Sequence, residues 1–421
     1  MRAPHAIPVK FRELSGAVGN RDEATHLIHR YPAKMFHRIP RTILDTIDTN
    51  CTSVILDPFC GSGTVLLEGL LRGHVAIGLD INPLAQLISR VKTILYNVDR
   101  LTTYYESIVH KARADGTAAP PDACFDFWFA PVVKSTLYHL RRAIDAVPRG
   151  KYRDFFLIAL TSIVRKVSLA DPSIPPPVKL RKERAERANE RYRKCLEFAL
   201  AVTRATVFEQ FAQAVRQNIR RTSTLHSYEQ LGSAVVLHGN RHAAATGLEA
   251  ESVDIILTSP PYCGAQKYVR SLKLEMRWLG LGEALIADID RNTLGTERVS
   301  RARPTQPYSD RTPELTILKQ IQERNPVRAL MATNYVKYIT DFTRECRRVI
   351  RPGGNIFVTF GTSRIAGIEV DMSAIFVRAA EDVGLSMRAS LVDSIPSRGL
   401  ITKRHSTAGR IDDERVVWLR G

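Results

Sequence analysis

The sequence predicts a doubly wound α/β fold, and three observations support this. A short β-branched strand over residues 53–59 leads through a glycine-containing turn into a helix that ends near Gly73. A second strand of the buried type, over 74–80, and a helix capped by Asn82 then complete a βαβ unit. After residue 230, strands and helices alternate again, which is typical of a mostly parallel sheet that is covered on both faces.

The remaining elements follow in chain order. Residues 1–99 hold an N-terminal segment, with a helix expected through Ile39–Ile47, and the first half of the α/β domain. Residues 100–230 are expected to form a large helical insertion, because the strand pattern fades and long mixed helical segments replace it. Residues 231–421 hold the second half of the domain. In that half we expect strands at 233–240, 253–262, 355–360, 387–395 and 414–420, helices at 273–281, 334–350 and 371–384, and a turn at 351–354.

Two polar stretches are candidates for contact with a partner. Residues 283–330 are polar and contain scattered basic residues together with residues that interrupt helices and strands, such as proline. We therefore expect an exposed loop or a small specificity segment there. Residues 179–194 contain eight Lys or Arg against three Glu. This second stretch fits either a solvated helix face or a surface that contacts phosphates.

Composition favours an acidic polymer as the partner. The 421 residues contain 61 Lys+Arg against 43 Asp+Glu, a formal net charge of +18, so nucleic acid is the first class to consider. No apolar run approaches the roughly 18 residues that span a bilayer, and no secretory signal pattern is seen, so we expect no membrane association and a cytoplasmic location. The six cysteines show no zinc spacing, and we expect no metal.

The first chemical motif is the loop from Asp57 to Thr64, which joins a strand to a helix. Its glycines let a ligand approach the backbone closely. Asp80 ends the next strand, 19 residues after Gly61, at the spacing of an acid that meets ribose hydroxyls. The third glycine of a dinucleotide fingerprint is replaced by Leu66, and the lysine of a P-loop is missing. NAD, FAD and ATP are therefore disfavoured.

The second motif is Thr258-Ser259-Pro260-Pro261-Tyr262, at the carboxyl end of a predicted strand. The two prolines fix the backbone and lack N–H donors, so carbonyl groups there can accept hydrogen bonds from a substrate amino group. Tyr262 offers a ring on which a base can stack. The pattern suits a site that holds a heteroaromatic amine.

The segments D-P-F-C-G-S-G-T, G-L-D-I-N-P and T-S-P-P-Y together resemble the amino-group DNA methyltransferases, over residues 25–100 and 233–421. The resemblance implies a Rossmann-like methyltransferase sheet and S-adenosyl-L-methionine as the cofactor. The upstream H-R-Y-P-A-K-M-F is similar to a motif that closes over the cofactor in one branch of that family. It places Lys34 at the methionine carboxylate, Asp80 at the ribose and Asn240 beside the adenine ring. The implied cofactor-binding residues are Pro32, Ala33, Lys34, Asp57, Phe59, Gly61, Gly63, Thr64, Asp80 and Asn240, and the implied catalytic residues are Ser259, Pro260, Pro261 and Tyr262.

The resemblance also implies the reaction and the partners. The substrate would be double-stranded DNA with a flipped target base, and a cognate restriction endonuclease would be a partner in a restriction-modification system. Ser259 in the first motif position favours cytosine N4 over adenine N6, and both remain open. Cys263 would act as a nucleophile only in carbon-5 methylation, which uses a different Pro-Cys motif.

Two alternatives remain. One is an RNA methyltransferase of the tRNA guanine-N2 type. Those enzymes usually carry a sizeable N-terminal RNA-binding domain and D-P-P-Y, whereas about 50 residues precede the first strand here and the motif is S-P-P-Y. The other alternative is a non-catalytic DNA-binding protein on the same scaffold. The intact glycine loop and S-P-P-Y motif count against it.

Overall fold

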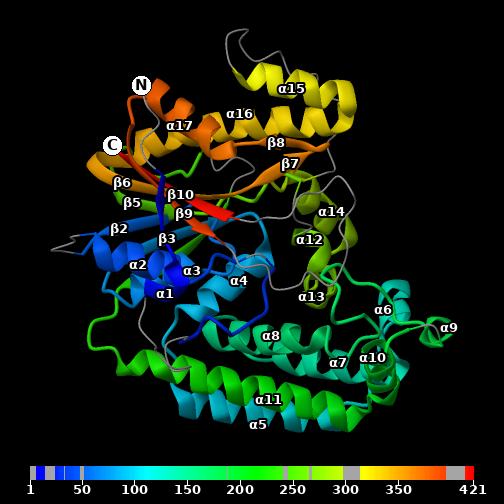
Figure 1. Ribbon diagram of the computed structural model, residues 1–421. Helices are drawn as coiled ribbons and strands as arrows, with labels where there is room; N and C mark the ends of the chain where they lie inside the picture. Colours follow the sequence, from blue (N-terminus) through cyan, green and yellow to red (C-terminus); the bar gives the residue numbers. More distant parts are fainter. Residues whose placement is uncertain are drawn as a thin grey trace.

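In a computed structural model of the chain, the described residues form a central eight-stranded sheet (Figure 1). The structure describes residues 6–14, 24–32, 34–47, 52–186, 188–239, 245–264, 268–296, 313–394 and 413–421. The strands of this sheet are β1 (Ala6–Pro8), β2 (Val54–Asp57), β3 (Val75–Asp80), β4 (Ser233–His238), β5 (Val253–Thr258), β6 (Ile350–Gly361), β9 (Ser386–Ser394) and β10 (Asp413–Arg420). β7 (Ser363–Ile365) and β8 (Ile368–Val370) pair as a separate antiparallel hairpin.

The strand order is β1-β9-β10-β6-β5-β2-β3-β4. From β2 the chain runs outward to β3 and β4, and it then returns to β5 on the other side of β2. β10 is antiparallel to both of its neighbours, whereas the other pairs are parallel. The reversal between β2 and β5 is a topological switch point, where open α/β sheets bind their ligands at the carboxyl ends of the strands. The fold is thus the Rossmann-like, doubly wound sheet that the sequence predicts.

At the centre of the sheet, in β2 and β5, successive residues point to opposite sides and both faces are buried. Ile55 and Ile255 pack toward α1 (Phe11–Leu14), α2 (Arg38–Thr46) and α3 (Thr64–Leu70). Leu56 and Ile256 pack on the other face, toward α16 (Pro326–Val349) and α17 (Met372–Asp382). α4 (Pro83–Lys92) follows β3 and begins at Asn82, whose side chain accepts a hydrogen bond from the Leu84 amide.

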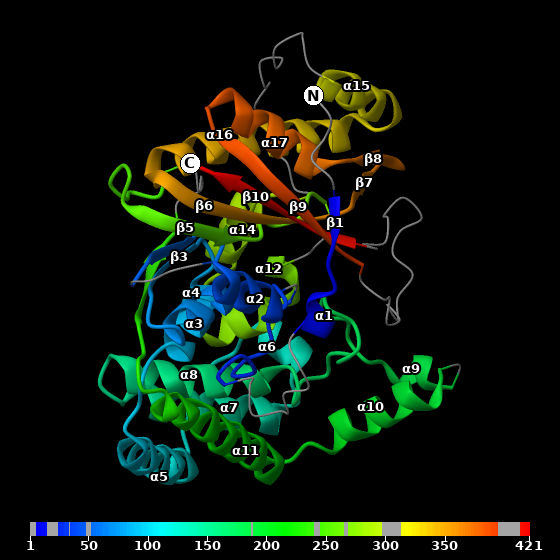
Figure 2. The same cartoon turned by 60° about the vertical axis from the view of Figure 1, so that its left-hand side comes forward.

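Between α4 and β4 the chain forms a mostly helical body. Its helices are α5 (Val98–Ala114), α6 (Ala123–Trp128), α7 (Pro131–Asp145), α8 (Lys151–Val164), α9 (Lys182–Ala185), α10 (Glu190–Ala201), α11 (Arg204–Ser223) and the 3-10 turn η2 (Thr224–Ser227). The apolar residues of α8 are buried at its centre and join α4 to this body. α9 and α10 extend away from the other helices (Figure 2).

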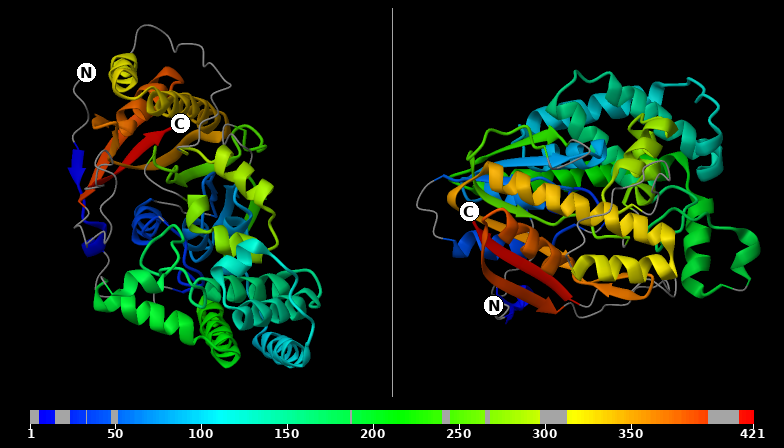
Figure 3. Two further views of the ribbon diagram at one scale, coloured as in Figure 1. Left: turned by 90° about the vertical axis from the view of Figure 1, so that its right-hand side faces the viewer. Right: turned by 90° about the horizontal axis from the view of Figure 1, so that it is seen from above.

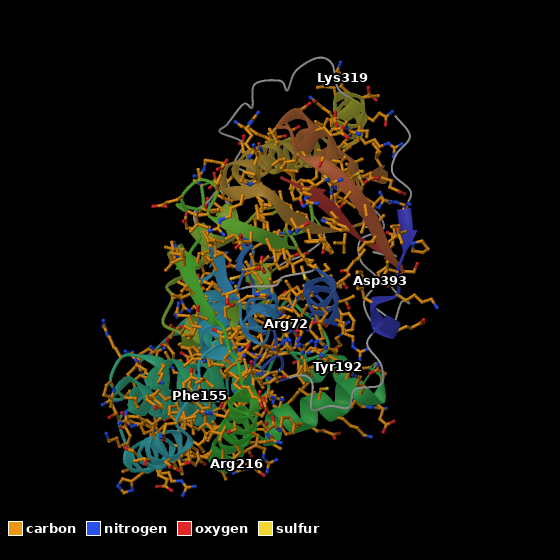
Figure 4. The ribbon with its side chains drawn as sticks, turned by 90° about the vertical axis from the view of Figure 1, so that its left-hand side faces the viewer. Arg72, Phe155, Tyr192, Arg216, Lys319 and Asp393 are labelled. Atoms are coloured by element: carbon orange, nitrogen blue, oxygen red, sulfur yellow. The ribbon has the colours of Figure 1, made fainter. Side chains whose placement is uncertain are left out.

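The sheet separates the helical body from α15 (Pro313–Arg324), α16 and α17, as the left-hand view of Figure 3 shows. Figure 4 shows the same arrangement, with Arg216 of α11 and Lys319 of α15 near opposite ends of the molecule. The remaining helices are α12 (Tyr268–Ser271), α13 (Lys273–Trp278) and α14 (Glu283–Asn292), which follow β5. No helix of the described ranges is long and apolar enough to cross a membrane.

The exposed loop predicted over 283–330 is wrong for the described residues of that stretch. α14 and α15 occupy most of 283–296 and 313–330, and Ile321 is fully buried against the α16 side of the core. The specificity role of the stretch stays a prediction. The turn predicted at 351–354 is an irregularity within β6, because the pairing with β5 shifts from Val253–Ile350 to Ile255–Asn355 and Gly353 has a φ of 76°. There the Gly353 amide donates to the Gly421 carbonyl at 2.9 Å.

Candidate active site

The two motifs meet at the switch point of the sheet. Asp57 ends β2 and Thr258 ends the neighbouring strand β5, and the Thr258 hydroxyl donates to Asp57 Oδ1 at 2.6 Å. The Phe59 amide donates to the same oxygen at 3.2 Å. A single buried carboxyl group therefore fastens the glycine loop to the S-P-P-Y segment across 201 residues of sequence.

The glycine loop needs its glycines for conformation and for space. Gly61 and Gly63 have φ angles of 49° and 70°, in the left-handed region that L side chains rarely adopt. A Cβ atom on Gly63 would lie 2.8 Å from the hydroxyl of Ser89, which donates to the Gly61 carbonyl at 2.9 Å. α4 thus packs against the glycine loop through Ser89. Thr64 begins α3 immediately after this loop.

Asp80 faces the same loop from the end of β3. Its Oδ2 accepts from the Gly61 amide at 3.0 Å, and its Oδ1 accepts from the Asn82 amide at 2.7 Å. Burial raises the pKa of Asp80 to about 6, although these amide bonds favour the carboxylate. Burial likewise raises the pKa of Asp57 to about 7. Each Asp80 oxygen has further lone pairs that can accept from a ribose hydroxyl.

The accessible groups at this edge of the sheet test whether the predicted cofactor fits. Gly61 and Asp80 are half-buried, so a ligand can reach the loop backbone and the carboxylate at the end of β3. A side chain at Gly61 would meet the Tyr31 ring at 3.4 Å, so the glycine leaves this approach open. S-adenosylmethionine has ribose hydroxyls from which the Asp80 carboxylate can accept hydrogen bonds and a methionine end that can lie along the glycine backbone.

The S-P-P-Y segment is held from several sides. The Tyr262 hydroxyl donates to Glu414 Oε1 at 3.1 Å, and the ring lies so close to Gly361 that a Cβ there would be 2.7 Å from Cε2. The Ser259 side chain hydrogen-bonds with Tyr262 and with the Thr359 carbonyl, the latter at 3.4 Å. The tyrosine and serine are thereby fixed by the ends of β6 and β10.

The prolines and the following turn complete the segment. Pro260 is buried and Pro261 is half-buried. Beyond them, the Gly264 amide donates to the Gly295 carbonyl at 3.0 Å. A Cβ on Gly295 would lie 2.9 Å from the Tyr262 carbonyl oxygen, so the loop after α14 packs closely against this segment.

The other predicted residues differ in their surroundings. Pro32 is half-buried, and Lys34 is exposed and donates to the His26 carbonyl at 3.3 Å. The Phe59 ring packs on Tyr338 and Phe342 of α16, with centroid distances of 6.0 and 5.4 Å. Ala33 and Asn240 lie outside the described residues.

Sequence reasoning missed four residues that shape this site: Tyr31, Ser89, Gly361 and Glu414. The Tyr31 ring lies 3.4 Å from the position of a Gly61 Cβ, and its place beside the Pro32 motif was the available signal. Ser89 lies in the second turn of α4, on the face that meets the loop. Gly361 and Glu414 carry no local signal, because they reach Tyr262 only through the pairing of β6 with β10.

Cysteine and metal chemistry have little support here. Burial raises the pKa of the Cys263 thiol to about 12, so the thiol is not activated as a nucleophile. Within the described ranges, no group of three or more His, Cys, Asp or Glu could hold a metal ion.

The fold, the glycine loop and Asp80 are compatible with a methyltransferase that uses S-adenosylmethionine, and comparison with known proteins supports that class. The family model UPF0020, described as an RMKL-like methyltransferase domain, matches residues 28–103. Type II methyltransferase M.MvaI of Kocuria varians is 24% identical, covering 92% of this chain and 88% of that protein. M.AvaI of Nostoc sp. is 23% identical, covering 94% and 83%. M.BsoBI of Geobacillus stearothermophilus is 22% identical, covering 89% and 81%.

The chain is therefore an S-adenosylmethionine-dependent methyltransferase. Similarity to the type II enzymes extends along nearly the whole chain and is not restricted to the cofactor loop. The resemblance to DNA methyltransferases that the motifs indicate is confirmed. The comparisons do not separate cytosine N4 from adenine N6.

Proposed function

We propose that the chain is a site-specific DNA methyltransferase that transfers a methyl group from S-adenosylmethionine to the exocyclic amino group of a flipped base. Cytosine N4 is favoured over adenine N6. The observation that carries this proposal is the Thr258–Asp57 hydrogen bond, which fastens the target-base motif to the cofactor loop at the switch point. The type II relatives support a role in restriction-modification.

The S-P-P-Y segment can orient an amino group. Pro260 and Pro261 have no N–H, so the carbonyls of this turn and the Ser259 hydroxyl can accept the amino hydrogens without competition from local donors. Once its hydrogens are held, the nitrogen lone pair can point toward the methyl donor. Tyr262, pinned through its hydroxyl to Glu414, would present its ring to the base in one orientation.

Positioning accounts for the catalysis in this scheme. The bound cofactor supplies a methyl group that is already activated on a sulfonium, so an oriented amine can attack it directly. Asp80 and the glycine loop hold the ribose and the methionine end. Pro32 and Lys34 cover the site from the N-terminal segment. The buried Cys263 thiol takes no part in the reaction.

A target base inside a duplex cannot reach this buried turn, so the base must leave the helix while phosphates are gripped on either side. The net charge of +18 suits that grip. α9 and α10 extend from the helical body and carry exposed Lys182, Arg184, Arg191 and Arg193. We assign the phosphate contacts to the arm that α9 and α10 form. Recognition of the DNA sequence is assigned to this arm or to residues 283–330.

The test is transfer of labelled methyl from S-adenosylmethionine to unmethylated duplex DNA and, in parallel, to bulk tRNA, followed by nucleoside mass analysis. We expect N4-methylcytosine in DNA, and loss of the label with Ser259→Ala. Ser252→Ala is the matched control, because its hydroxyl donates to the Glu249 carbonyl outside the site. Detection of N6-methyladenine instead would support methylation of an amino group but would show that the target base is adenine and not cytosine. Label in tRNA alone would refute DNA as the substrate.

A further inference from the structure

A pocket of about 570 Å³ lies in the helical body, and its lining residues belong neither to the glycine loop nor to the S-P-P-Y segment. The segment that follows α8, residues 165–180, forms one wall of the pocket, and α10 forms the other. The volume falls within the range of roughly 300–1,000 Å³ that small-molecule sites occupy. Methyl transfer itself does not use these residues, so the pocket calls for a ligand of its own.

One face of α10 lines the pocket and carries cations together with an exposed aromatic ring. Four of its residues follow the i, i+3, i+4, i+7 spacing of a single helix face. They are Arg191, Lys194, Cys195 and Phe198. The Phe198 side chain is 49% exposed, whereas Leu180 on the opposite wall is buried, so the floor of the pocket is apolar. An exposed ring beside an apolar floor is a surface on which a planar group can stack.

The rim of the pocket carries positive charge that acidic side chains do not neutralise. Among the residues that the structure describes, no carboxylate lies within ion-pair distance of Arg165, Lys166 or Arg191. The Arg165 guanidinium donates to backbone carbonyls instead. Lys194 pairs with Glu190 at 2.6 Å, so that exposed pair adds no net charge. Three cations beside a stacking surface suit a ligand that is both planar and anionic, as a nucleotide is.

Arg165 also connects the pocket to the target-base motif. Its guanidinium donates to the Ser271 carbonyl at 3.3 Å. Ser271 is the last residue of α12, the first helix after the S-P-P-Y segment. In Figure 1, α10 lies on the same side of the sheet as α12, α13 and α14, which follow the carboxyl end of β5. DNA bound at the S-P-P-Y segment would therefore pass near this pocket.

We propose that the pocket binds a second nucleotide of the DNA, displaced from the duplex, with its base on the Phe198 ring and its phosphate among Arg165, Lys166 and Arg191. A base inside a duplex presents only its edges, so the ring can stack only on a base that has left the duplex. This nucleotide is not the methylated one, because the pocket and the S-P-P-Y segment have no lining residue in common. The inference rests on the proposed function, since it takes DNA as the substrate.

The test measures the affinity of the full chain for three fluorescent duplexes by anisotropy. One duplex is fully paired, one carries a single unpaired thymidine, and one carries an abasic residue at that position. The wild type should bind the thymidine duplex roughly 5- to 100-fold more tightly than the other two, which is the effect of stacking one base on an aromatic side chain. Phe198→Ala should reduce this preference to less than about twofold and leave affinity for the paired duplex within about twofold. Leu200→Ala is the matched control, because Leu200 is 51% exposed on the same helix but does not line the pocket.

The charged part of the pocket is tested by the dependence of affinity on salt. Lys166→Gln should reduce the slope of log affinity against log salt concentration for the thymidine duplex by about 0.7–0.9, the value of one lost phosphate contact. Lys111→Gln is the control, because Lys111 is exposed on α5 outside the pocket. An unchanged slope with Lys166→Gln would contradict the placement of the phosphate.

The same measurements can overturn the proposal. A preference for the thymidine duplex that survives in folded Phe198→Ala would do so, because the unpaired base would then enter another site. If the variant does not fold, photochemical cross-linking of the wild type to 5-iododeoxyuridine at the unpaired position decides. The cross-link should map to the α10 peptide that contains Phe198, and a cross-link to the Tyr262 peptide alone would refute the proposal.

Two further outcomes separate the source of the nucleotide and the proposed function. Binding of free thymidine monophosphate that Phe198→Ala abolishes, without any preference among the duplexes, would assign the pocket to a soluble nucleotide and reject a role in DNA binding. Binding of the paired duplex with no preference for the unpaired thymidine would reject this inference alone. Failure to bind any of the three duplexes would instead reject DNA as the substrate, and this inference with it.

Discussion

Replacing Gly361 by alanine should displace the tyrosine of the target-base motif. The new Cβ would lie 2.7 Å from Tyr262 Cε2 and 3.1 Å from Cδ2 and Cζ. Ordinary carbon contacts are about 3.5 Å, so the ring must retreat by roughly 0.8 Å. Gly361 is in a strand without a positive φ, so alanine suits the backbone itself. A misplacement near 1 Å at a reacting centre costs about 100-fold in rate, and we expect kcat to fall by about 10- to 100-fold.

The assay is single-turnover methyl transfer to duplex DNA, with binding of S-adenosylhomocysteine and thermal unfolding measured alongside. Because the change lies at Tyr262 and not at the glycine loop, cofactor affinity should stay within about twofold, and overpacking should cost about 1–3 kcal/mol of stability. Gly282→Ala is the control, since a Cβ there meets nothing within 4 Å. Unchanged kcat in folded Gly361→Ala would refute the assignment of Tyr262 to the base.

Three further outcomes are expected. The pKa of Asp80 is raised to about 6, so its carboxylate is lost as pH falls through 6. Calorimetry should then show affinity for S-adenosylhomocysteine dropping about 10-fold from pH 7 to pH 5, and Asp80→Asn should be weak and independent of pH in this range. Thr258→Val should lower the free energy of unfolding in urea by about 1–3 kcal/mol at pH 8, where Asp57 is ionised. The loss should be smaller at pH 5, because the pKa of Asp57 is raised to about 7 and its carboxyl group is protonated there. An equal loss at both pH values would contradict this expectation. Glu68→Gln should cost about 1.5–3 kcal/mol in the same assay, since the buried carboxylate that accepts from His26, Arg41 and Arg72 becomes a neutral amide, although Arg72 keeps Asp45 at 2.6 Å; a loss below about 0.5 kcal/mol would argue against that charge network.

Local patterns were sufficient for the elements that the chain specifies locally. The strand–loop–helix from β2 to α3 and the Asn82-Pro83 start of α4 depend on residues within a few positions of one another, and the structure has them. Asp80 could be placed because its spacing from Gly61 is set by one helix and one strand. These elements account for the half of the site predicted to hold the cofactor.

Other features depend on distant partners, which no local pattern displays. Gly353 has the left-handed φ expected of a turn, 76°, yet its amide donates to the Gly421 carbonyl, and β6 pairs with β5 on both sides of this irregularity, at Ile350 and Asn355. In residues 283–330, flanking breakers obscured the apolar residues, such as Ile321, that bury α15. Glu414 reaches the Tyr262 hydroxyl across 152 residues, so the fixing of the tyrosine could not be predicted.

The adjacency of β2 and β5 has a consequence for the order of folding. The two strands are paired at Ile55 and Ile255, although the whole helical body lies between them in the chain. Closing so long a loop is slow, because its entropy must be lost before the contact forms. The βαβ unit can assemble early from neighbouring segments, whereas the complete active site must await the return of the chain at β5. Recovery of methyl transfer after dilution from denaturant should accordingly lag behind recovery of helical circular dichroism.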